Sequence, residues 1–319
     1  MRNIGFVISG KENERRRAVL PHHLVKVRHR SNLIFERGYG LPFGIPDEAF
    51  EAMGCKVMDR DAVYEMDVIC NPKAPEPNER DRFRKGQTLF GWMHAVQGRA
   101  TVDLLLDKKM TAVAWEDMFV GGRHCYWRNN EIAGEAAILH AANYLGRLLD
   151  GTRAAVIGTG NCARGAIRSL GRLGSTVQVY DRESISLLRD ELPEFDLVVN
   201  AVLWDVFRKD HIIYRSDVAR MRRNAMIIDI SCDEAMGIET SRPTSISDPI
   251  YIVDDVIHYV VDHTPSLYFQ SATDAIGEVT ARFLDVLVEE TSDACLDAAT
   301  VVRDGQIIDE RISRFQERA

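Results

Sequence analysis

Three polar side chains in the first part of the chain follow short apolar runs, where an enzyme could hold and protonate a small substrate. Arg16 lies in the loop K-E-N-E-R-R-R-A-V-L-P, and a guanidinium can bind a carboxylate through two parallel hydrogen bonds. Lys73 lies between two prolines after the run 68–70, and His94 follows the run 89–92. An imidazole with a pKa near about 6.5 suits proton transfer at neutral pH. Together these residue types suit chemistry at the carbonyl or imine carbon of an anionic substrate.

Each of these residues also has an ordinary structural interpretation. A triple arginine such as residues 15–17 is usually a solvated face, and a single loop lysine or histidine is commonly a surface residue. Glu116 ends the run 112–115, where its carboxylate can orient His94 or bind an amine. The residues alone leave both interpretations open.

The glycine-rich segment V-I-G-T-G-N-C-A-R-G, residues 156–165, carries the most informative pattern. Gly158 permits a tight turn, Gly160 lets the backbone approach a pyrophosphate, and Ala163 takes the third small-residue position, where helix meets strand. A helix that begins at Asn161 directs its N–H groups and its positive dipole end at the phosphates. The segment predicts a dinucleotide-binding turn, and the alternative is an ordinary strand-to-helix turn.

Two adjacent residues bear on the choice of dinucleotide. Asp181 ends the next strand-like run, 176–180, where a carboxylate can accept a ribose hydroxyl and favours NAD. Arg182 can instead bind the 2′-phosphate of NADP. The two residues therefore favour different dinucleotides, Asp181 NAD and Arg182 NADP.

Composition limits the classes of partner. The 319 residues are 45% hydrophobic, which suits two globular domains. A net charge of −8 and a pI near 5.7 give no electrostatic support for a nucleic-acid or acidic-membrane partner. The six cysteines show no metal-ligand spacing, so we expect no metal and reduced thiols in a cytoplasmic protein. We also expect no signal peptide and no membrane span.

The order of β-like and helical patterns predicts an α/β protein with two Rossmann-like domains. The active site is expected in the inter-domain cleft. The expected substrate domain comprises residues 1–130, completed by 272–319, and the dinucleotide-binding domain comprises 131–271. Strands are expected at 4–8, 33–36, 68–70, 88–90, 111–115, 154–157, 176–180, 197–201, 225–230, 251–253 and 259–261, and helices at 21–30, 47–53, 101–109, 131–149 and 272–299.

Motifs along almost the whole chain resemble the alanine dehydrogenase and saccharopine dehydrogenase superfamily, which includes the transhydrogenase nucleotide domains. The N-terminal loop is similar to the family's K-x-x-E-x-R-V-A-L-T-P, and the resemblance places the substrate-binding arginine on Arg16. It likewise implies that Lys73 is the catalytic lysine and His94 the proton-transferring histidine. The other matching segments are E-R-G-Y-G, M-D-V-I-C-N-P-K-A-P, F-G-W-M-H, N-E-I-A-G, the glycine loop, I-E-T-S-R-P-T and D-D-V-I-H-Y.

Two differences distinguish this chain from the alanine dehydrogenases of the superfamily. Lys73-Ala74-Pro75 replaces the Lys-Glu-Pro of alanine dehydrogenases, and their long insert before the glycine loop is absent. The short chain, the start I-G-F-V-I-S-G-K-E-N-E and the late segment V-V-D-H-T-P-S most resemble the N5-(carboxyethyl)ornithine synthase family. That resemblance implies NADPH, with NADH as the alternative, as the reductant for condensing pyruvate with the side-chain amine of ornithine or lysine. The resemblance also implies a homo-oligomer. The alternatives are reductive amination with ammonia, a saccharopine dehydrogenase-like activity, or a nucleotide-binding protein without turnover.

Overall fold

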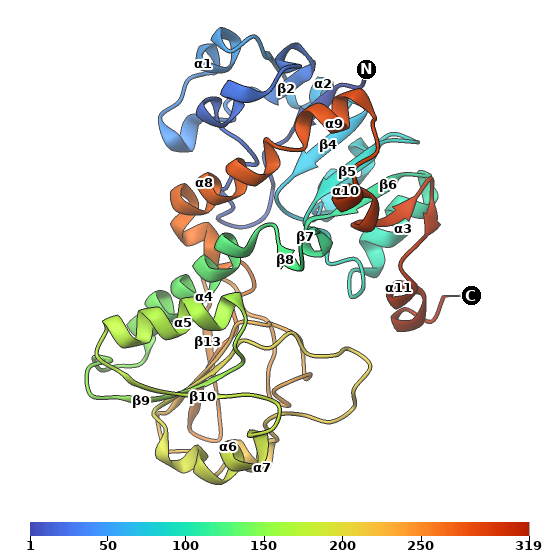
Figure 1. The fold of residues 1–319 in the computed structure, drawn as a ribbon. Helices are drawn as coiled ribbons and strands as arrows, with labels where there is room; N and C mark the ends of the chain where they lie inside the picture. Colours follow the sequence, from blue (N-terminus) through green and yellow to red (C-terminus); the bar gives the residue numbers. More distant parts are fainter. Residues whose placement is uncertain (319) are drawn as a thin grey trace. The chain divides into compact units, whose positions relative to one another are not determined.

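A computed structural model describes residues 1–318 and contains two compact units. Within these residues, unit 1 comprises Met1–Trp127 and residues 269–318, and unit 2 comprises Arg128–Tyr268. Both units are α/β, as the sequence predicts, and each is built on its own sheet (Figure 1). None of the helices formed by residues 1–318 has the length and apolar character of a membrane span.

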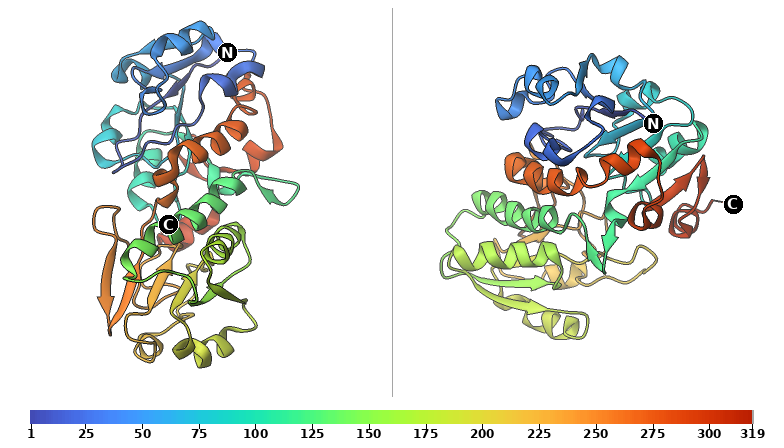
Figure 2. Two further views of the ribbon diagram at one scale, coloured as in Figure 1. Left: turned by 90° about the vertical axis from the view of Figure 1, so that its left-hand side faces the viewer. Right: turned by 45° about the horizontal axis from the view of Figure 1, so that its top comes forward.

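Unit 1 contains an eight-stranded sheet in the order β16-β15-β6-β5-β4-β1-β2-β3. The six strands from β6 to β3 are parallel, whereas β15 pairs antiparallel with β6 and with β16. Figure 2 shows the C-terminal strands, in red, at the edge of this sheet. The strands are β1 (Ile4–Phe6), β2 (Leu33–Glu36), β3 (Lys56–Met58), β4 (Val68–Asn71), β5 (Thr88–Gly91), β6 (Thr111–Ala114), β15 (Thr300–Arg303) and β16 (Gln306–Ile307).

The apolar faces of these strands are buried under helices from both ends of the chain. One core joins β1 and β2 to the C-terminal segment, with Phe6, Phe35 and Leu284 all fully buried. A separate two-stranded sheet is formed by β7 (Phe119–Val120) and β8 (Arg123–His124). The α-helices of unit 1 are α1 (Asp47–Ala52), α2 (Arg60–Val63), α3 (Arg99–Asp107), α8 (Phe269–Thr280), α9 (Leu284–Glu289), α10 (Ala294–Ala298) and α11 (Glu310–Phe315).

Two helix predictions for unit 1 are corrected by the structure. The segment 272–299 is not one helix but lies in three, α8, α9 and α10. The break between α9 and α10 arises because Glu290 adopts a left-handed φ of 56° after α9 and Asp293 caps the start of α10. The segment 21–30 is a 3-10 helix, Pro21–Lys26, followed by a second short one. Local apolar spacing continues across each break, which is why the pattern alone missed it.

Unit 2 contains a six-stranded sheet in the order β10-β9-β11-β12-β14-β13, parallel except for the edge strand β13. The order reverses between β9 and β11, which is the usual place for a dinucleotide in such sheets. The strands are β9 (Arg153–Ile157), β10 (Thr176–Tyr180), β11 (Leu197–Asn200), β12 (Met226–Asp229), β13 (Ile250–Val253) and β14 (Val256–Tyr259), and the α-helices are α4 (Trp127–Ala141), which begins at the end of unit 1, α5 (Asn161–Arg172), α6 (Ile185–Glu191) and α7 (Arg215–Val218).

Two predictions for this part of the chain are also corrected. The last strand is β14 rather than 259–261, because Asp254 and Asp255 both have positive φ and form the tight turn of a β13–β14 hairpin. The helix expected at 131–149 ends at Ala141 and continues as a 3-10 turn, Ala142–Tyr144, in which the Asn143 side chain donates to the carbonyls of the last α-helical turn.

Candidate active site

The residues predicted to handle substrate follow adjacent parallel strands of unit 1. The loop of Arg16 follows β1, Lys73 follows β4, His94 follows β5 and Glu116 follows β6, and these four strands are neighbours in the sheet. Parallel neighbours end at the same edge of a sheet. The topology thus brings residues from four distant parts of the sequence to one edge.

Arg16 is buried in an ion pair with Glu14. Its Nε donates to Glu14 Oε1 at 2.8 Å and its Nη2 to Glu14 Oε2 at 2.5 Å. Both residues are at most 5% exposed. Burial acts to raise the pKa of Glu14, but the charge and hydrogen bonds of Arg16, with a further contribution from Lys73, outweigh it and lower the pKa. Glu14 is therefore a carboxylate that fixes the guanidinium plane.

Two cationic side chains lie near the Glu14 carboxylate. Arg16 is paired with it, the charge of Lys73 also acts on it, and all three residues are buried. Buried charge is costly unless it is paired. A guanidinium and an ammonium in such a group can donate hydrogen bonds to the oxygens of a small anionic ligand such as a 2-oxo acid.

The three consecutive arginines occupy different environments. Only Arg15 is exposed, with its guanidinium 4.2 Å above the Phe269 ring. Arg17 is buried and donates to the carbonyls of Tyr39 and Arg16. The solvated-face interpretation thus holds for one of the three.

Lys73 is 8% exposed, and its backbone N–H donates to Asn71 Oδ1 at 3.1 Å. Gly91 lies opposite Asn71 in the β4–β5 register, and a Cβ there would lie only 1.8 Å from the Asn71 carbonyl oxygen. This close approach requires glycine at the end of β5. The close approach of the two strands therefore fixes the position of the backbone just before Lys73.

His94 has a left-handed backbone with φ of 47°, which is uncommon outside glycine. The Glu116 carboxylate holds it there, accepting the backbone N–H of His94 at 2.6 Å and of Met93 at 3.2 Å. The Gly98 N–H also donates to the His94 carbonyl at 2.8 Å. The side chain of His94 is exposed.

Glu116 therefore contacts the backbone that carries His94. Burial raises the pKa of Glu116 to about 7, although the N–H groups of Met93 and His94 act in the opposite direction. Of the two sequence-based interpretations of Glu116, orienting His94 matches these contacts better than binding an amine. The neighbouring Asp117 pairs with Arg311 at 2.8 Å.

The glycine turn of unit 2 has the form that a dinucleotide requires. Gly158 has φ of 107°, and Gly160 is the N-cap residue of α5 with no side-chain cap. A Cβ at Gly160 would meet nothing within 4 Å, and Asn161 begins the helix as predicted. Exposed backbone at a helix N-terminus suits a pyrophosphate, so these residues fit a nicotinamide dinucleotide.

Helix α5 lies unusually close to α4 behind this turn. A Cβ at Gly165 would lie 1.9 Å from the Glu131 carbonyl oxygen, and a Cβ at Gly134 would lie 2.0 Å from the Cys162 carbonyl oxygen. Ala163 is fully buried at the same level of the helix. The two glycines let the backbones touch, which sets the position of the phosphate-facing end of α5.

Asp181 and Arg182 are both exposed after β10. Oδ1 of Asp181 accepts hydrogen bonds from the Ser184 hydroxyl and from the N–H groups of Ser184 and Glu183, and these bonds lower its pKa. The carboxylate is thereby oriented at the strand end. Arg182 forms no ion pair with any residue in 1–318.

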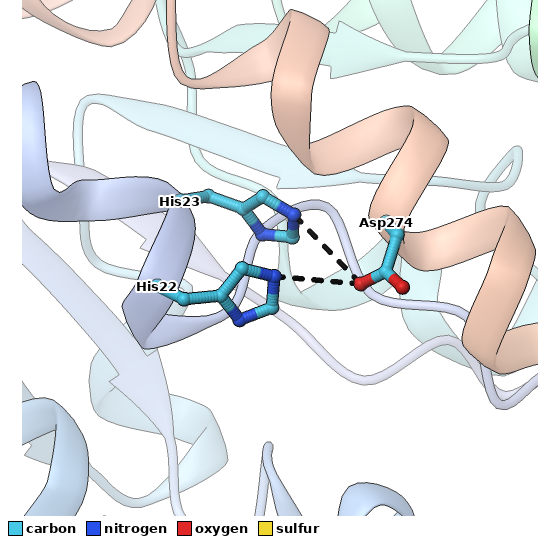
Figure 3. A group of neighbouring side chains, drawn as sticks. All are labelled: His22, His23 and Asp274. Carbon is cyan, nitrogen blue, oxygen red and sulfur yellow. Dashed lines mark ion pairs between the residues drawn. The ribbon is translucent and has the colours of Figure 1, made fainter.

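His22, His23 and Asp274 form the group of side chains within residues 1–318 whose spacing comes nearest to a metal site (Figure 3). Nε2 of His22 and of His23 lie 3.4 and 4.0 Å from Asp274 Oδ1. However, His23 Nδ1 accepts the Leu20 N–H, so the neutral ring carries its proton on Nε2, where a metal would need a lone pair. The group therefore serves to hold the 3-10 helix at Pro21–Lys26 against α8.

Sequence reasoning missed Glu14, Gly134 and Gly165. Glu14 was visible only as the E of the loop motif, two residues before Arg16. The glycines were visible as small residues in N-E-I-A-G and in the glycine loop, but their partners lie on another helix. No local pattern could pair them.

Comparisons with known protein families find matches to residues in both units. The N-terminal domain profile of the family described as alanine dehydrogenase/PNT matches residues 9–123, and its C-terminal domain profile matches residues 182–310. The chain belongs to the alanine dehydrogenase/PNT family. It is an NAD(P)-dependent oxidoreductase of that family.

Relatives within the family carry two different names. An N(5)-(carboxyethyl)ornithine synthase of Clostridium botulinum is 29% identical over 90% of this chain and 98% of its own. An alanine dehydrogenase of Mycolicibacterium smegmatis is 27% identical over 98% of this chain and 96% of its own. A solved L-alanine dehydrogenase structure superposes with a TM-score of 0.84 at 23% identity, covering 99% of both chains, which confirms the fold.

Proposed function

We propose that the chain catalyses the NADPH-dependent reductive condensation of pyruvate with the side-chain amine of ornithine, or of lysine, giving an N-(carboxyethyl)amino acid. The observation that carries this proposal is the buried group of Glu14, Arg16 and Lys73, whose guanidinium and ammonium donors suit the carboxylate and carbonyl oxygens of a 2-oxo acid. The similarity to N(5)-(carboxyethyl)ornithine synthases supports the choice of amine.

Each residue at the sheet edge has a role in this proposal. Arg16, held by Glu14, binds the pyruvate carboxylate, and Lys73 donates a hydrogen bond to the carbonyl oxygen as negative charge develops on it. His94 gives and takes the protons needed to form and dehydrate the carbinolamine. Glu116 positions His94 through its backbone.

The dinucleotide is held by the turn of unit 2 in this proposal. Gly158, Gly160 and Asn161 form the phosphate site, and the buried Ala163 lets the helix pack closely against the strand behind it. Asp181 accepts a ribose hydroxyl, and Arg182 binds the 2′-phosphate. When bound, the nicotinamide supplies the hydride that reduces the imine carbon. Asp181 alone favours NADH, so the preference for NADPH depends on Arg182.

The experiment that tests the function is a matrix of 2-oxo acids against amines, followed by NADPH oxidation and product mass. Pyruvate and 2-oxoglutarate are each combined with ornithine, lysine and ammonia. We expect pyruvate with ornithine to give a kcat/KM at least about 10²-fold above pyruvate with ammonia, because remote polar contacts position the reacting amine. Equal or better turnover with ammonia, with alanine as the product, would refute the proposal.

The second candidate is reductive amination by ammonia, favoured by the full-length similarity to alanine dehydrogenases. It uses the same edge residues and needs no site for a second amino acid. A preference for 2-oxoglutarate with lysine would instead indicate a saccharopine dehydrogenase-like activity. The same matrix separates all three.

We also propose that the enzyme is cytoplasmic and homo-oligomeric. All six cysteines are free thiols, which suits a reducing compartment. Two large apolar side chains of the β7–β8 hairpin, Phe119 and Val120, are 50% and 60% exposed and are candidates for a subunit contact. Light scattering of the purified enzyme measures the oligomeric state.

A further inference from the structure

Cys125 and Cys295 lie side by side in unit 1, although 170 positions separate them in the sequence. Their sulfur atoms are 3.8 Å apart, within reach of a weak S–H···S hydrogen bond. Cys125 directly follows β8 and is half-buried, whereas Cys295 is in α10 and buried. A disulfide places the two sulfurs at about 2.0 Å, so the pair must close by about 1.8 Å for the bond to form.

We propose that Cys125 and Cys295 form a reversible disulfide when the enzyme meets a low-molecular-weight disulfide, for which oxidised glutathione is the probe. The Cys125 thiolate attacks one sulfur of the oxidant, forming a mixed disulfide and releasing one thiolate. The Cys295 thiol loses its proton to solvent and attacks the Cys125 sulfur, releasing the second thiolate. The protein thereby loses two hydrogens, and the oxidant is reduced to two thiols.

The surroundings of the two sulfurs assign the order of these steps. Burial raises the pKa of both thiols, and that of Cys295 reaches about 12, with Cys125 and Asp293 adding to the effect. For Cys125, the hydrogen bond with Cys295 and the charge of Arg282 oppose the effect of burial on its pKa. Cys125 is thus the attacking thiol and Cys295 the resolving one. Attack is slow at neutral pH, and the second step is helped by proximity.

Packed aromatic side chains connect Cys125 to Arg16, the residue proposed to bind the substrate carboxylate. Tyr126, next to Cys125, stacks on Trp115 with ring centroids 4.6 Å apart and lies 5.3 Å from Trp92. The Arg16 guanidinium lies 5.5 Å from the centroid of Trp92. A shift of Cys125 toward α10 therefore moves Tyr126 and the two tryptophans, and Trp92 lies against the Arg16 guanidinium. We expect the oxidised enzyme to bind the 2-oxo acid more weakly and the dinucleotide unchanged.

The test incubates the purified full chain with oxidised glutathione at pH 8.5, followed by intact mass and peptide mapping. The expected product has lost two hydrogens and yields a cross-linked peptide pair containing Cys125 and Cys295. Cys125→Ser abolishes it, as does Cys295→Ala. Cys55→Ala, which removes a buried thiol elsewhere in unit 1, leaves it unchanged. An unchanged mass, or glutathione retained on Cys125 without the internal bond, overturns the proposal.

A second measurement tests the consequence for function. The KM for pyruvate should rise at least about threefold on oxidation and return to its original value with dithiothreitol, because Arg16 is displaced. The Kd for NADPH should stay constant, because the dinucleotide turn is not displaced. An unchanged KM in fully cross-linked enzyme overturns the link to Arg16. This arm rests on the proposed function, whereas the mass measurement does not. Enzyme that forms the cross-link but shows no activity with pyruvate would therefore contradict the proposed function and leave the disulfide proposal intact.

Discussion

The contact between α4 and α5 offers a sharp test because one methyl group should disturb it. In Gly165→Ala, the new Cβ would lie 1.9 Å from the Glu131 carbonyl oxygen and 2.8 Å from its carbon. Both atoms are backbone, so no side-chain rotation can relieve the contact. The helices must separate by about 1 Å or distort, in an interior that is packed like a crystal.

The expected cost follows from two opposing terms. Replacing glycine with alanine inside a helix stabilises it by about 0.8–1 kcal/mol, whereas overpacking costs about 1–3 kcal/mol and occasionally more. The overpacking here is against backbone, so its cost should lie at or above the upper end of that range. We expect Gly165→Ala to reduce the free energy of unfolding by about 2 kcal/mol.

Gly171→Ala is the matched control. It makes the same chemical change in the same helix, but a Cβ at Gly171 meets nothing within 4 Å. It should leave stability unchanged or raise it by up to about 1 kcal/mol. Urea unfolding of the two variants and the wild type, at constant protein concentration, measures the difference.

Nucleotide binding provides the second readout. The phosphate-facing end of α5 begins at Asn161, one turn before Gly165, so a shift of the helix should weaken NADPH binding. A loss of about 1.4 kcal/mol corresponds to a tenfold higher Kd. Gly165→Ala that matches Gly171→Ala in both stability and Kd would show that the close approach of the two helices is not needed.

Three further predictions concern the site. His94→Ala and Lys73→Ala should each lower kcat by about 10²–10⁴ with the Kd for NADPH nearly unchanged, because the turn at Gly158 holds the nucleotide; full activity of His94→Ala across the pH range would assign proton transfer elsewhere. Burial raises the pKa of Glu116 to about 7 from an ordinary 4.5, so the folded state retains a proton that the unfolded chain releases, and this contribution to stability is lost as pH rises from 4.5 to 7. Glu116→Gln should flatten that part of the pH profile of Tm, and an unchanged profile would contradict the assignment. Arg182→Ala should reduce the preference for NADPH over NADH about tenfold in kcat/KM, since a charge-assisted contact is lost, and an unchanged ratio would show that another residue binds the 2′-phosphate.

Local patterns predicted most of the secondary structure. Strand β2 has the predicted limits, and β4, β5 and β9 differ from them by one residue, because buried parallel strands are short β-branched or apolar runs between turn residues. The helix start at Asn161 was predicted from the glycine turn that precedes it. Such features depend on residues within a few positions of one another.

The alternation of strands and helices also predicted that the loops of Arg16, Lys73 and His94 would follow parallel strands. That places them at one edge of a sheet once the strand order is known. The strand order itself, with β1 between β2 and β4, depends on contacts among distant segments. Sequence therefore determined which side chains leave the sheet, but not which of them become neighbours.

Tertiary structure decided the features that depend on distant partners. The segment after residue 299, for which the sequence predicts no strand, forms β15 and β16, because β6 presents an unpaired edge to which β15 adds antiparallel. Burial of Arg16 and exposure of Arg15 cannot be distinguished in R-R-R, since the difference arises from Glu14, Trp92 and Phe269. The glycines at positions 134 and 165 acquire their role only where two helices touch. Sequence fixes local geometry through neighbours along the chain, and folding assigns burial, charge pairing and close packing through neighbours in space.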